Sequence, residues 1–111
     1  MGEAEQFVEE LVTAVPGLQV TLDEHLADFN ELLPHVYFGE ITRWIQRQVD
    51  EDVNLDEVGR VLSFLEQGYA DDGDQVRELI TVSFLENLDQ GSPVFCLLGR
   101  QLQDVALSLR K

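Results

Sequence analysis

The chain is organised around one stretch, Leu32-Leu33-Pro34-His35-Val36-Tyr37-Phe38-Gly39-Glu40-Ile41-Thr42-Arg43-Trp44-Ile45, its densest apolar and aromatic run. Pro34 disfavours helical geometry at the residue before it and suits a first helical turn. One helix should therefore end before Pro34, and a second should follow it. Over residues 35–49, apolar side chains recur on one stripe at helical spacing, which predicts a central amphipathic helix.

Five further helices are predicted on either side of this central helix, because apolar residues recur there with the same period and start signals precede most of them. The first covers residues 3–15, and the second begins at the capping-box sequence Thr21-Leu22-Asp23-Glu24. The next two begin near Leu55 and directly after Asp74, which is expected to cap the fifth helix. The last has Ser92 as its cap and Pro93 in its first turn, and it runs as one helix to Leu109.

These elements predict an all-α protein of about six helices in a single domain, residues 1–111. The arrangement is either an irregular bundle or stacked, HEAT-like helical hairpins. We favour hairpins, because the segment from Leu55 to Leu88 contains the short polar turn that joins antiparallel helices.

The strongest functional signal is charge. The chain carries 22 acidic and 7 basic residues, a net charge of -15, and no Lys or Arg precedes Arg43. Such a field repels nucleic acid and anionic membranes, and it attracts cationic surfaces at rates that fall with salt. Arg43 and Arg47 lie one turn apart, but Glu40 neutralises much of their field. The alternative explanation is that the acidity serves only solubility.

Cys96 lies in the apolar run Val94-Phe95-Cys96-Leu97-Leu98, so we expect a buried, inert thiol. A lone cysteine forms no intrachain disulfide, and the acidic N-terminus does not resemble a signal peptide. No apolar run is long enough to span a membrane. We therefore expect a cytoplasmic protein.

Metal and catalytic motifs are weak. Asp50-Glu51-Asp52-Val53-Asn54 begins like a calcium loop, but Leu55 and Val61 stand where glycine and a closing glutamate belong. His25 is expected to pair at the surface with Glu24 and Asp28, and His35 to be a hydrogen-bonded structural residue. No nucleophile motif or phosphate loop is present. We expect no metal, no cofactor and no enzymatic activity.

The predicted partner-binding residues are half-exposed aromatic side chains together with acidic residues that steer a basic partner. The acidic groups fall mainly in two turns that bracket the fourth helix. The set comprises Tyr37, Glu40, Trp44, Asp50, Glu51, Asp52, Tyr69, Asp71, Asp72 and Asp74. Each of them also has a structural reading, as a core aromatic or as a solvated turn residue.

Two segments resemble a family of small, acidic bacterial proteins regarded as immunity proteins of toxin systems. They are Leu33-Pro34-His35-Val36-Tyr37-Phe38-Gly39-Glu40-Ile41-Thr42-Arg43-Trp44 and Val76-Arg77-Glu78-Leu79-Ile80-Thr81-Val82-Ser83-Phe84-Leu85-Glu86-Asn87-Leu88. The resemblance implies a cytoplasmic, antitoxin-like binder and transfers no catalytic residue.

The leading hypothesis is an immunity-type protein that neutralises a basic toxin, such as a nuclease, by occluding its substrate groove. The second is a helical scaffold that binds a peptide or forms a homodimer through apolar surface, without a toxin partner. Binding that is indifferent to salt would contradict the first hypothesis, and a homodimer that buries Trp44 would favour the second. The third, a metal-dependent or carboxylate-based enzyme, predicts heat on titration with divalent cations.

Overall fold

The structure is a computed structural model that describes residues 2–71, 73–88 and 91–109. In these ranges the chain forms seven α-helices, two short 3-10 helices and no strand, which confirms the all-α prediction. The elements are α1 Glu3–Ala14, η1 Pro16–Leu18, α2 Gln19–Phe29, α3 Pro34–Glu51, α4 Leu55–Asp71, α5 Asp74–Ser83, η2 Leu85–Asn87, α6 Val94–Leu97 and α7 Arg100–Leu109.

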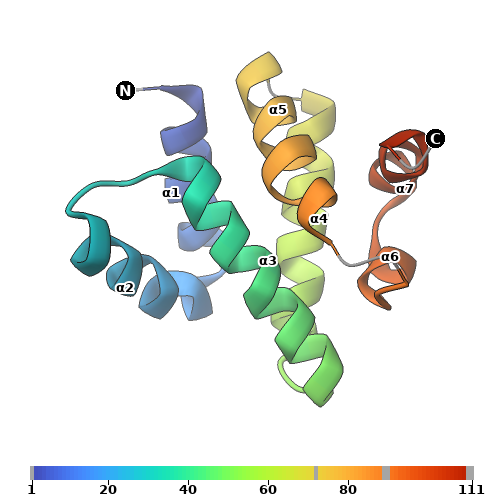
Figure 1. The fold of residues 1–111 in the computed structure, drawn as a ribbon, viewed down its shortest axis with the longest axis horizontal. Helices are drawn as coiled ribbons and strands as arrows, with labels where there is room; N and C mark the ends of the chain where they lie inside the picture. The colour runs from blue at the N-terminus through green and yellow to red at the C-terminus, as the bar shows by residue number, and fades with distance from the viewer. Residues whose placement is uncertain (1, 72, 89–90, 110–111) are drawn as a thin grey trace.

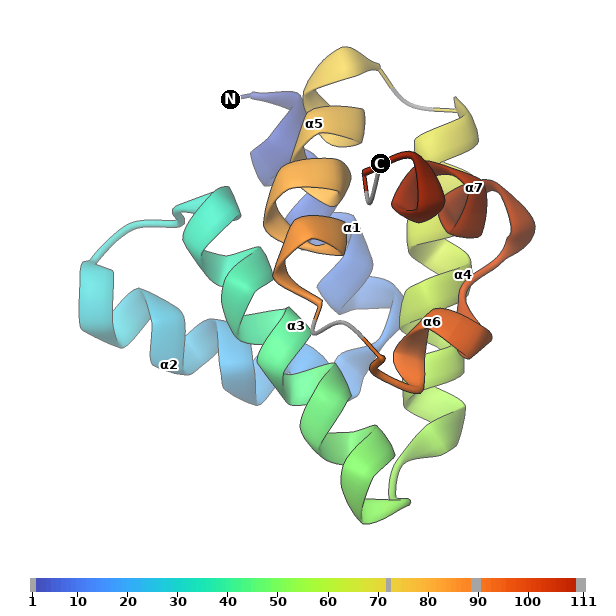
Figure 2. The same cartoon turned by 45° about the vertical axis from the view of Figure 1, so that its right-hand side comes forward.

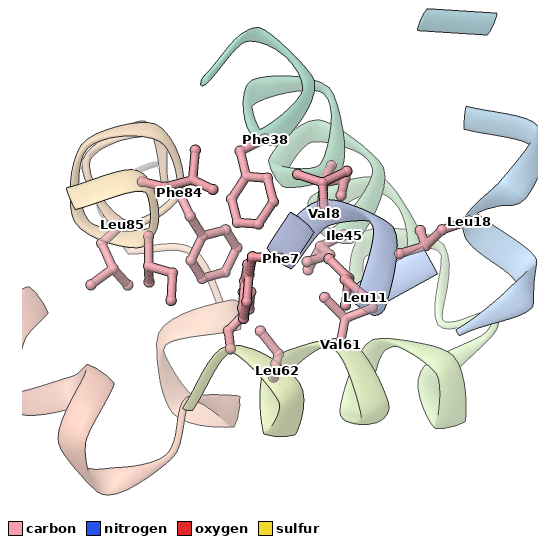
Figure 3. Packing of buried hydrophobic residues seen from close by; sticks show 14 of the residues in the cluster. Phe7, Val8, Leu11, Leu18, Phe38, Ile45, Val61, Leu62, Phe84 and Leu85 are labelled. Carbon is pink, nitrogen blue, oxygen red and sulfur yellow. The ribbon is translucent and has the colours of Figure 1, made fainter. Parts of the chain in front are cut away.

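The core lies between α1, α3, α4 and α5, with α2 on one side and α6 and α7 on the other (Figures 1 and 2). Helices α4 and α5 form the predicted antiparallel pair. Helix α3 packs extensively on α5, and α1 contacts both members of the pair, so the four helices form an irregular bundle. Figure 3 shows Phe7 of α1 at the centre of this core, pointing toward Leu62 and Phe84.

The predicted apolar stripes of α1 and α3 are confirmed. Phe7, Leu11 and Val15 are at most 2% exposed, because their spacing keeps them on one side of the helix. In α3, Phe38 and Ile41 are fully buried, as the central stripe predicts. The sequence therefore predicted the core-facing sides of the longest helices.

Three predictions about helix boundaries are wrong. Helix α2 begins at Gln19, directly after η1, so Thr21 lies inside the first turn, and its hydroxyl donates to the Leu18 carbonyl at 2.6 Å instead of capping the helix. The carboxy-terminal helix is divided at Leu98 and Gly99 into α6 and α7. Asp74 is the first residue of α5, and Gly73 occupies the N-cap.

The Glu66 carboxylate explains why α7 begins where it does. Its two oxygens accept the backbone N–H groups of Gln101 and Leu102 at 2.8 and 3.1 Å. These amides have no partner within a helix that starts at Arg100, so a carboxylate from α4 accepts their hydrogen bonds. The negative charge of that carboxylate also lies at the positive end of the helix dipole, which is favourable. The break after α6 is thereby fixed by a contact between residues that lie far apart in the sequence.

Three surface predictions are also corrected. Cys96, expected in the core, is exposed. The stripe predicted for α2 is incomplete, since Leu26 and Phe29 are 38% and 42% exposed. His25, expected at the surface, is completely buried.

No helix in the described ranges combines the length and the apolar character needed to cross a bilayer.

Candidate functional site

The predicted aromatic partner-binding residues have three different environments. Tyr37 is fully buried, so its predicted role as a half-exposed interface residue is wrong. Trp44 is half-buried against the core. Tyr69 is half-buried, and the Arg77 guanidinium lies 5.5 Å from the centre of its ring while Arg77 Nε donates to the Tyr69 carbonyl at 2.9 Å. The Tyr69 ring therefore already holds a cation of its own chain.

Tyr37 is held by a hydrogen-bonded chain that begins at its hydroxyl. The Thr21 hydroxyl donates to the Leu18 carbonyl, and the Tyr37 hydroxyl shares a hydrogen bond with Thr21 Oγ1 at 2.8 Å and donates to the same carbonyl at 3.4 Å. Burial raises the pKa of Tyr37 to about 12, and the carboxylates of Glu40 and Asp23 add to the rise while the Thr21 bond opposes it. Tyr37 is thus a neutral structural residue at physiological pH.

Glu40, the other predicted site residue of this region, is engaged with the buried imidazole of His25. The Leu33 backbone N–H donates to His25 Nε2 at 3.1 Å, so Nε2 carries no proton and Nδ1–H donates to Glu40 Oε2 at 2.9 Å. The imidazole thus joins α2, the segment before α3, and α3 itself. The expected surface pairing of His25 with Glu24 and Asp28 is wrong.

The two predicted acidic turns lie at opposite ends of α4 (Figure 2). Asp50, Glu51 and Asp52 end α3 beside the start of α4, whereas Asp71 and Asp74 flank the turn between α4 and α5. A 17-residue helix is about 25 Å long, which exceeds the Debye length of about 8 Å at physiological salt. The structure therefore does not bring the two turns into one patch. Asp72 lies outside the described residues.

Helix α1 supplies acidic side chains to the turn between α4 and α5. Glu3, Phe7 and Glu10 recur at i, i+4 and i+7, so they share one face of α1. The Glu3 carboxylate lies against Gly73, where an added Cβ atom would come within 3.0 Å of Glu3 Oε2. Sequence reasoning missed this contribution, because α1 and Gly73 are some sixty positions apart and the signal is only a mixed apolar and acidic helix face.

Two adjoining concavities form where this face meets α4 and α5, and we call them together the α1 groove. One, of about 220 Å³, is lined by Phe7, Glu10, Phe64, Gln67, Gly68 and Asp71. The other, of about 210 Å³, is lined by Glu3, Gln6, Phe7, Glu10, Gly73 and Val76. Both share Phe7 and Glu10, and the rings of Phe7 and Phe64 pack with centroids 5.2 Å apart.

The α1 groove combines an aromatic floor with acidic walls. Glu3, Glu10 and Asp71 line it, and among the residues that the structure describes no basic one does. Elsewhere too, the arginines Arg43, Arg47, Arg60, Arg77 and Arg100 make no ion pair with a carboxylate in the part of the chain that the structure describes. In these residues no arginine therefore neutralises the carboxylates of the groove, which is suited to a cationic group.

Other chemistry finds less support. No group of three His, Cys, Asp or Glu residues within residues 2–71, 73–88 and 91–109 is arranged to hold a metal ion. His35 Nδ1 does meet the Ser83 hydroxyl, the one serine and histidine contact recorded there. Ser83 is only 4% exposed and its carbonyl accepts from Thr42 and Asn87. This contact joins α3 to α5 and confirms the predicted structural role of His35.

The chain was also compared with known proteins. A family model described as a domain of unknown function, DUF7674, matches residues 8–110. The matched range begins inside α1 and covers every later helix of the described structure. No curated protein matches the chain, and no solved structure matches it either.

Proposed function

We propose that this chain, which belongs to the DUF7674 family, is a cytoplasmic immunity-type protein that binds a cationic protein toxin and blocks its active groove. The observation that carries the proposal is the excess of carboxylates: the chain has a net charge of -15, and within the described residues no arginine forms an ion pair with a carboxylate. The resemblance of residues 33–44 and 76–88 to immunity-like proteins supports the toxin as partner.

The mechanism is steering followed by occlusion. Exposed carboxylates raise the rate at which a cationic surface meets this protein, and short-range contacts then hold the complex. A nuclease groove that binds phosphates presents the Lys and Arg side chains that such carboxylates fit. No chemical step on the chain is needed, which agrees with the expectation that it is not an enzyme.

The test is whether this chain relieves the growth arrest that a toxin causes. Proteins encoded beside the gene of this chain would be expressed singly in a heterologous bacterium, with and without this chain. We expect one basic protein to arrest growth and co-expression of this chain to restore it. The proposal fails if no neighbour arrests growth, or if the arrest persists although both proteins are produced.

Two pairs of charge-removing substitutions, at the two ends of α4, show which acidic surface faces the toxin. Asp71→Asn with Asp74→Asn removes two charges at one end of α4, and Asp50→Asn with Asp52→Asn removes two at the other, so the pairs are matched in charge. Slower association with the toxin by at least about threefold at low salt is expected for the pair that faces it. Equal rates for both pairs and the wild type would remove the steering step.

A second candidate, a homodimeric or peptide-binding scaffold, is favoured by the apolar surface of α6 and α7. Leu97 and Leu107 are 49% and 60% exposed, and a cavity of about 220 Å³ there is lined by Phe95, Cys96, Gln103, Ala106 and Leu107. Light scattering that gives a dimer mass, which Leu107→Ser returns to the monomer mass, would support this candidate. A monomer mass over the accessible concentration range would exclude the homodimer.

A further inference from the structure

We infer that the α1 groove binds the guanidinium group of one arginine side chain of a partner protein, stacked on Phe64 and held by Glu10 with Asp71 or Glu3. This inference deepens the proposed function and rests on it for the identity of the partner, because it names the anchor within an otherwise diffuse acidic surface.

The floor is aromatic and partly accessible. Phe7 is only 2% exposed and is fixed in the core, whereas Phe64 is half-buried, and their rings are tilted at 42°. A planar cation lying on an accessible aromatic ring gains both dispersion and cation–π attraction. The nearby contact of Arg77 with the Tyr69 ring shows the same pairing within this chain.

The walls of the groove carry carboxylates. Glu10 lines both concavities, so a cation at their boundary lies beside it in either position, while Asp71 closes one side and Glu3 the other. Gln6 Nε2 donates to Glu10 Oε2 at 3.4 Å, which leaves most of the acceptor capacity of that carboxylate unused. Within residues 2–71, 73–88 and 91–109, no basic side chain lines the groove to compete for it.

The arrangement selects guanidinium over other cations. A metal ion needs several oxygen atoms converging on one point, and the described residues contain no such group. A lysine ammonium is a compact point charge, whereas a guanidinium is flat and spreads five donors over its edge. A flat ion is therefore better suited than a compact one to stack on Phe64 while its edge donors face the carboxylates of the walls.

In the experiment, the full, isotopically labelled chain is titrated with acetyl-arginine amide, and the NMR chemical shifts of its backbone amides are followed. Acetyl-citrulline amide is the control probe, since it has the same shape without the charge. We expect shifts confined to Gln6, Phe7, Phe64 and Gly68 with arginine amide and absent with citrulline amide. Glu10→Gln should weaken binding by about fivefold and Phe64→Leu by about threefold.

Glu9→Gln is the matched control variant, because Glu9 is the exposed neighbour of Glu10 on α1 and does not line the groove. Equal shifts with both probes, equal weakening by Glu9→Gln and Glu10→Gln, or no shift with arginine amide would overturn the inference. A toxin that still binds with steep salt dependence would then leave the proposed function standing. If arginine amide binds and no neighbouring toxin is neutralised, only the proposed function fails.

Discussion

Replacing Tyr37 by Phe should change the pH dependence of stability in a way that can be calculated from the structure. At pH 7 the variant loses the hydrogen bond to Thr21 Oγ1, at 2.8 Å, without changing the packed ring. One such bond contributes about 1 kcal/mol to the free energy of unfolding. The wild type should therefore be more stable than Tyr37→Phe by about that amount at neutral pH.

At high pH the difference in stability between the wild type and Tyr37→Phe should change sign. Burial raises the pKa of Tyr37 from 10.0 to about 12, so between these values the unfolded phenol is ionised while the folded one is neutral. The wild type begins to lose stability near pH 10, and the loss reaches about 2 kcal/mol by pH 12. Tyr37→Phe cannot lose this contribution, so the two stabilities should become equal between about pH 10 and pH 11.

The assay is urea unfolding of both proteins at a series of pH values from 7 to 11.5, followed by circular dichroism. Effects of Tyr69 and the arginines are common to both proteins and cancel in the difference. Thr21→Val is the control, because it removes the hydrogen-bond partner but keeps the phenol, and its alkaline loss should persist. A stability difference that stays constant up to pH 11.5 would refute the reasoning.

Three further predictions concern individual contacts. His25→Leu should lower the free energy of unfolding, measured by urea titration, by about 2–3 kcal/mol, because the Leu33 N–H loses its acceptor. A decrease of less than half this amount would contradict the buried contact. Glu66→Ala should cost about 1–2 kcal/mol and speed hydrogen exchange at the Gln101 amide, and unchanged exchange there would show that the carboxylate does not cap α7. Cys96 should react fully with a disulfide reagent in the native protein, and protection until unfolding would contradict its exposure.

The sequence predicted what depends on neighbours along the chain. The stripes of α1 and α3 follow from spacing alone, and Pro34 begins α3 because its fixed φ and missing N–H suit a first turn. The turn between α4 and α5 was predicted from its run of small polar residues. These features need no knowledge of tertiary structure.

The predictions failed where a tertiary contact determines the start of a helix or the burial of a side chain. Thr21 fits a capping box, but η1 places the helix start two residues earlier. Nothing near Arg100 in the sequence shows that Glu66 will satisfy the amides that begin α7. Tyr37 was expected at an interface because aromatic composition does not distinguish a buried ring from an exposed one.

The candidate site was predicted only in part for the same reason. Asp71 was identified from its turn, whereas Glu3 and Glu10 of α1 were not among the predicted site residues. Phe64 carried no signal beyond helical spacing. A groove built from the first and fourth helices depends on how they pack, and no local pattern encodes that packing.

The central claim is that uncompensated carboxylates on a helical bundle capture a cationic protein. The most direct measurement is the association rate of the neutralised toxin with this chain over a range of salt concentrations. The account predicts a rate that falls steeply as salt rises and that falls less steeply for Asp71→Asn with Asp74→Asn. A rate that does not change with salt, or a toxin whose bound surface is acidic, would contradict the claim.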